Sequence, residues 1–213
     1  TQGVSSAASD VYKRQELLGE LEVLIKGENS LEIISESGDL VIATKLDISG
    51  EFGNSLTRGA AGPGGWAGGE INGKGLGPGG GLPGVDPGGA GYGGAGSGAT
   101  AISGQPYGDG AISNLIGGSG GGGFITDTSG GGGAGAVRFI SNKKITVHSL
   151  IRAVGGGGMS GAAGGSGGAI HLIAKDIHLG GNAVLDVSGG SNGGGGGRIF
   201  LEANDTFLNT GRN

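Results

Sequence analysis

The chain has 213 residues, of which 59 are glycine, and its formal net charge is −5. Glycine makes up about 7% of an ordinary protein, so a core packed mainly from large side chains is not expected here. The absence of cysteine excludes a disulfide scaffold, and glycine does not recur at every third position as collagen requires. The acidic balance argues against nucleic-acid binding, and no apolar run is long enough for membrane insertion.

The first residues look foreign to the rest of the chain. Residues 5–15 read SSAASDVYKRQ, which resembles a translated sequencing-adapter tail of metagenomic reads, and the chain does not begin with methionine. We therefore expect residues 1–15 to be an artefactual tail, and the remainder to be one domain of a fragment.

Residues 16–52 are expected to supply the first strands of this domain. Short runs rich in β-branched residues lie at 21–25, 31–34, 40–43 and 46–49, and turn-forming residues separate the first three. Residues 1–52 hold ten acidic and four basic side chains, which we interpret as a solvated strand face.

Residues 53–135 form a glycine- and proline-rich insertion. They contain 35 glycines in 83 positions and all five prolines of the chain. One interpretation is a flexible linker. The other is an ordered segment packed like polyglycine II, because a pure spacer would not need Trp66, Tyr92 or Tyr107. The sequence leaves the choice open.

Residues 136–213 contain an imperfect repeat of about 30 residues. The runs AVRFI, AIHLIA and RIFLEA align, and Val137, Ile170 and Ile199 are then spaced by 33 and 29 residues. Such repeats bury their apolar face by stacking on one another, which predicts an all-β fold: a parallel, right-handed β-helix (a β-solenoid) with long glycine-rich loops. Alternation places three side chains in one outward stack (Arg138, His171, Phe200) and three in an outward charge ladder (Asp47, Arg152, Asp186).

The order of motifs from Gly91 to Ala203, including GGGAGAVRFI, GGSGGAIHLIA and GGGGGRIFLEA, resembles the glycine-rich repeat regions of large bacterial surface and secreted β-helix proteins. These proteins are adhesin-like and similar in architecture to autotransporter passenger domains. The resemblance implies a right-handed parallel β-helix located outside the cytoplasm, at the cell surface or secreted. It implies no particular ligand and no catalytic residue.

Two groups of side chains are candidates for glycan chemistry. Trp66, Tyr92 and Tyr107 could stack on sugar rings, or they could pin the insertion onto the domain. Asp186 with Arg152 and Lys175 is the nearest cluster for a polysaccharide-active enzyme, although we prefer to interpret it as a charge ladder between coils.

Metal and cofactor chemistry is weakly indicated. The three histidines (His148, His171, His178) are expected to be solvated surface residues, and no metal site or catalytic residue is assigned. Calcium held by single aspartates of the insertion (Asp86, Asp109, Asp127) is kept as an alternative, and no other cofactor is expected.

The sequence therefore favours a non-catalytic structural or adhesive module that binds glycan, matrix or a neighbouring cell through a repetitive surface and its loops. One alternative is a polysaccharide lyase or glycoside hydrolase on a β-helix. Another is a phage tail-fibre-type polyglycine adhesin, which requires packed glycine helices with binding loops at their tips. Ligand identity and oligomeric state are left open.

Overall fold

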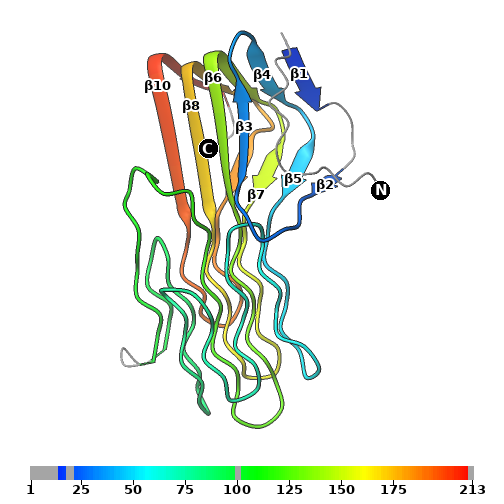
Figure 1. The fold of residues 1–213 in the computed structure, drawn as a ribbon, viewed down its shortest axis with the longest axis vertical. Coiled ribbons are helices and arrows are strands. Elements are labelled where there is room, and N and C mark those ends of the chain that lie inside the picture. Colours follow the sequence, from blue (N-terminus) through cyan, green and yellow to red (C-terminus); the bar gives the residue numbers. More distant parts are fainter. Residues whose placement is uncertain (1–13, 18–21, 99–101, 211–213) are drawn as a thin grey trace.

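The computed structural model describes residues 14–17, 22–98 and 102–210. Parallel strands occupy one end of the molecule, and extended glycine-rich chain fills the other (Figure 1). The described residues form no helix; their strands, in chain order, are β1 (Arg14–Leu17), β2 (Glu22–Leu24), β3 (Leu31–Ser35), β4 (Asp39–Ile42), β5 (Lys45–Asp47), β6 (Ala136–Val147), β7 (Leu150–Arg152), β8 (Ala169–Leu179), β9 (Val184–Asp186) and β10 (Arg198–Asn209).

The strands form two sheets. The first has the order β1-β4-β6-β8-β10, with β3 also paired to β6, and the second has the order β2-β5-β7-β9. All of these pairings are parallel. Of the expected tail 1–15, residues 1–13 lie outside the described residues, whereas Arg14 and Gln15 belong to β1 and pair with β4.

The repeat alignment read from the sequence is confirmed by the strand register. Val137 of β6 lies opposite Ile170 of β8, which lies opposite Ile199 of β10. The inward apolar side chains of both sheets meet in one core, whose fully buried members include Ile42, Leu46, Val137, Phe139, Ile145, Ile151, Ile170, Leu172 and Ile177.

The prediction of a parallel β-helix is wrong. Between β5 and β6 the described residues form no strand, only two isolated bridges, Gly53 with Gly158 and Gly84 with Phe124. The glycine-rich segments are also not loops between coils. They pack against one another as a polyglycine block, made of residues 48–53, 59–69, 75–81, 88–96, 117–123, 130–135, 153–158, 162–168 and 187–197.

Segment 130–135 shows why this block is not a sheet. The amides of residues 130, 131 and 132 donate, in that order, to the carbonyls of Gly69, Ala163 and Glu51. The amides of residues 133, 134 and 135 donate to the same three neighbouring segments in the same order, at Trp66, Ser166 and Ile48. The six N···O distances lie between 2.8 and 3.0 Å. A three-residue repeat of hydrogen-bond direction is typical of polyproline II-type helices, which have three residues per turn. A β-strand, by contrast, bonds in only one plane.

The carbonyls of segment 130–135 follow the same rule. They accept from segments 59–62 and 118–121 and from the amides of Gly156 and Ala169. The segment is therefore bonded on all sides, and its buried peptide groups are paired as burial demands.

Close packing in the block requires glycine. A Cβ on Gly132 would collide with the carbonyl of Ala60, and one on Gly131 would collide with the carbonyl of Gly156. Because the obstacles are backbone atoms of hydrogen-bonded neighbours, they cannot move aside without breaking those bonds.

We predict that Gly132→Ala lowers the free energy of unfolding by about 1–3 kcal/mol or more, as overpacking of a rigid core does. Gly110→Ala is the matched control, since a Cβ at Gly110 meets nothing within 4 Å, and it should change stability by less than about 0.5 kcal/mol. Denaturant unfolding followed by circular dichroism measures both. Equal effects would contradict the tight packing described for the block.

Candidate functional site

The three aromatic residues that were expected from the sequence either to stack on sugars or to pin the insertion lie together, and each is partly or fully buried. The ring centroids of Tyr92 and Tyr107 are 4.9 Å apart, and those of Trp66 and Tyr107 are 5.9 Å apart. Tyr92 is 1% exposed, and the other two are half-buried. The Tyr107 hydroxyl donates to the carbonyl of Gly117 at 2.7 Å. Tyr92 is therefore unavailable to a glycan, and the cluster pins the glycine-rich chain in place.

Burial changes the acidity of these phenols. It raises the pKa of Tyr92 to about 12, although the nearby Arg198 guanidinium opposes the shift. Burial also raises the pKa of Tyr107, against the hydrogen bond that its hydroxyl accepts from Ser119.

The predicted outward stack on the first sheet is in register but covered. Arg138, His171 and Phe200 lie opposite one another on β6, β8 and β10. Residues 107–116 fold back over them, and His171 is only 4% exposed. The expectation of a solvated His171 is therefore wrong, because no pattern in residues 107–116 indicates that this segment returns to the sheet.

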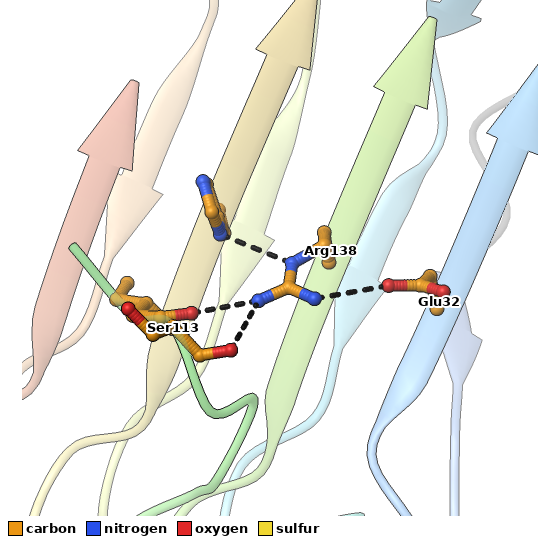
Figure 2. A network of polar contacts seen from close by, with 5 residues as sticks. Glu32, Ser113 and Arg138 are labelled. Carbon is orange, nitrogen blue, oxygen red and sulfur yellow. Dashed lines mark hydrogen bonds and ion pairs between the residues drawn. The ribbon is translucent and has the colours of Figure 1, made fainter. Parts of the chain in front are cut away.

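Arg138 ties that covering segment to the sheet (Figure 2). Its Nη2 donates to the carbonyl of Ile112 at 2.6 Å, its Nη1 donates to Glu32 at 3.2 Å, and its Nε donates to Nδ1 of His171 at 3.1 Å. Burial, and then the Arg138 charge, lower the pKa of His171. The His171 ring is therefore neutral, and its buried Nδ1 accepts the hydrogen bond from Arg138.

The charge ladder lies on the second sheet. Asp47, Arg152 and Asp186 are opposite one another on β5, β7 and β9, and Arg152 Nη1 is 3.7 Å from Asp47 Oδ2. Lys175 is on β8 of the first sheet and pairs with Asp205 at 3.1 Å. The enzyme-like cluster of Asp186, Arg152 and Lys175 is therefore not assembled.

The other candidates for metal binding are separate. The rings of His148 and His178 are 6.3 Å apart, and His178 Nε2 is 3.3 Å from the Thr210 hydroxyl. The carboxylate of Asp109 accepts hydrogen bonds from Ser113, which lower its pKa. Within residues 14–17, 22–98 and 102–210, no group of three His, Asp or Glu side chains could hold a metal ion.

Loops from distant parts of the chain meet at the end of the polyglycine block opposite the sheets (Figure 1). We call this end the tip and define it by residues 54–58, 70–74, 84–87, 124–129 and 159–161. Hydrogen bonds join neighbouring loops: Ser129 N to Asn54 O (3.0 Å), Asn72 N to Phe124 O (2.8 Å) and Thr128 Oγ1 to Ser160 O (3.3 Å).

The tip carries apolar side chains that the solvent reaches. They are Leu56 (91% exposed), Val85 (73%), Met159 (50%), Ile71 (41%) and Ile125 (39%). A hollow of about 440 Å³ opens beside the Arg58–Glu70 ion pair and is lined by Leu56, Thr57, Ile71 and Ser129.

Sequence reasoning missed these residues, although a signal exists. Each apolar residue of the tip stands in a short non-glycine interruption of a glycine tract, as in SLTR, EIN or FITDTS. Such interruptions mark the points where the chain leaves the block and turns.

A groove of about 660 Å³ follows the side of the block. We call it the flank groove and define it by lining residues from segments 24–27, 47–52, 60–61, 152–155 and 189–191. It contains the exposed ring of Phe52 and two ion pairs, Lys26 with Glu51 and Arg152 with Asp47. Only Asp47 and Arg152 were singled out from the sequence.

Comparison of the chain with protein-family models, with curated proteins and with solved structures found no match. Among the residues that the structure describes, no helix is long and apolar enough to cross a membrane. The tip and the flank groove are therefore interpreted from their own geometry.

We predict that the two buried tyrosines titrate abnormally. In a Tyr12→Phe variant, Tyr92 and Tyr107 are the tyrosines that remain. Their absorbance near 295 nm should not change until the pH approaches about 12 in the folded protein, whereas both should ionise near pH 10 after unfolding. Because the folded state holds these protons more tightly, stability should fall as the pH rises from about 10 to 12. Native ionisation near pH 10 would contradict the buried cluster.

We predict that Arg138→Lys loosens residues 107–116. Lysine cannot donate to Ile112, Glu32 and His171 at once, so the free energy of unfolding should fall by about 1–3 kcal/mol. Amide hydrogen exchange in 107–116 should quicken at least ten-fold. Arg152→Lys, which changes an exposed arginine on the second sheet, is the control and should leave that exchange unchanged.

Proposed function

We propose that the chain is a non-catalytic adhesive module that contacts a cell surface or extracellular matrix through the tip. The observation that carries the proposal is the convergence of loops from five parts of the sequence on one end of a rigid block, with exposed apolar side chains on each. Rigid scaffolds that position variable loops are a common basis of binding surfaces. Exposed apolar patches mark interaction sites.

The scarcity of side chains in the polyglycine block fits a supporting role. Its interior is backbone with few side chains, so it supplies stiffness but little chemistry. The three-residue hydrogen-bond repeat favours the tail-fibre-type polyglycine adhesin, in which packed glycine helices carry binding loops. We include in this proposal that the module acts outside the cytoplasm.

The alternative of a polysaccharide lyase or glycoside hydrolase has lost its candidate cluster, because Lys175 lies on a different sheet from Arg152 and Asp186. The protein is accordingly expected to be retained on its target without releasing sugar from it.

The test uses fluorescently labelled protein and a panel of intact bacterial and animal cells, with and without Ca²⁺. The tip variant Leu56→Asp/Val85→Asp/Ile125→Asp should lose at least ten-fold in retention, because charges replace the apolar contact surface. The control Val184→Asp/Phe207→Asp changes exposed apolar side chains on the sheets, and it should bind like the parent.

Soluble reducing sugar is measured in the same samples. Its release by the parent protein would contradict a non-catalytic module. Equal losses of retention in the tip and control variants, or no retention of the parent on any surface, would contradict the assignment of the tip as the contact site.

A further inference from the structure

The flank groove holds an aromatic ring in a position suited to stacking. Phe52 is 63% exposed, and its ring rests against Gly157, where a Cβ would stand 2.5 Å from Phe52 Cε1. Glycine at 157 therefore allows the ring to lie against the backbone with the rest of its surface free. An exposed aromatic ring supported in this way offers a flat apolar surface at little further cost in conformational entropy.

The charges in the groove are balanced. Two bases, Lys26 and Arg152, and two acids, Asp47 and Glu51, are the charged residues that line it, and they pair as Lys26–Glu51 and Arg152–Asp47. Hydrogen-bond donors and acceptors thus stand side by side, with no net charge to attract an ion. A ligand that needs both at short spacing, and carries no charge itself, matches this lining.

We propose that the flank groove binds a neutral linear polysaccharide, with a sugar ring on Phe52 and hydroxyl groups bonded to the two ion pairs. A sugar ring has apolar C–H faces and a polar rim of hydroxyls, each both donor and acceptor. The glycines at 50, 155, 189 and 190 that line the groove have no side chains to obstruct a long, extended chain.

Other occupants fit less well. An anionic polysaccharide would meet the carboxylates of Asp47 and Glu51, and a cationic peptide would meet Lys26 and Arg152. A purely apolar segment would have to desolvate both ion pairs without replacing their water.

The experiment titrates the full chain, by calorimetry, with neutral hexasaccharides (β-1,4-glucan, β-1,3-glucan, α-1,4-glucan and β-1,4-mannan) and with hexagalacturonate as the acidic counterpart. The parent should bind at least one neutral chain and bind it at least ten-fold more tightly than hexagalacturonate. Phe52→Ala should weaken that binding at least ten-fold. Phe207→Ala removes a ring of similar exposure from β10, and it should change the affinity less than two-fold.

Two further variants separate stacking from folding. Phe52→Trp restores an aromatic surface and should recover binding, and Lys26→Ala/Glu51→Ala should weaken it with Phe52 intact. Thermal unfolding of each variant shows whether the fold is kept. Absence of binding to every neutral chain, preference for hexagalacturonate, or equal affinity in Phe52→Ala would overturn the proposal.

This inference does not rest on the adhesive role of the tip. The tip variant retains Phe52 and both ion pairs, so it should bind soluble hexasaccharide like the parent. Phe52→Ala should retain the parent's adhesion to cells. Loss of both activities in either variant would overturn the assignment of two separate sites.

Discussion

Backbone hydrogen bonding in three directions is the constraint on which the molecule depends. In segment 130–135 successive amides point to three different neighbours and then repeat. Such packing needs backbones closer than any side chain permits, which is why glycine fills the interior positions. Glycine loses much conformational entropy on ordering, so the hydrogen bonds of the block must offset a large cost. They can do so because the segments bond to several neighbours at once, as in 130–135, where each amide and each carbonyl has a backbone partner.

The two sheets fix the relative positions of the segments of the polyglycine block. Segments 48–53, 153–158 and 187–190 continue directly from β5, β7 and β9 of the second sheet, and segments 130–135, 162–168 and 193–197 lead directly into β6, β8 and β10 of the first. Strand register, fixed by the apolar core between the sheets, thereby sets the relative positions of the glycine helices. Exposed apolar side chains gather where the chain leaves this lattice at the tip, and an exposed ring and two ion pairs line the flank groove, so we place the proposed binding chemistry at those two places.

The candidate sites show which contacts could be predicted from sequence patterns alone and which could not. Strand alternation and repeat spacing were enough to align Asp47, Arg152 and Asp186, because register in a parallel sheet follows the repeat. The same reasoning failed for His171, which residues 107–116 cover. It also overlooked Phe52, whose exposure depends on contact with Gly157, 105 positions away in a different segment.

The sequence by itself determined the strands near both ends of the chain, their repeat, and the need for close backbone packing, since these follow from alternation, spacing and glycine content. Tertiary structure alone decided between a coil of strands and a lattice of glycine helices. A repeat of about 30 residues is compatible with either, because periodicity fixes which residues are neighbours but not the directions of their hydrogen bonds. In side-chain-bearing strands those directions lie in one plane. In glycine they are free to follow three, and the neighbours that accept them are known only once the whole chain has folded.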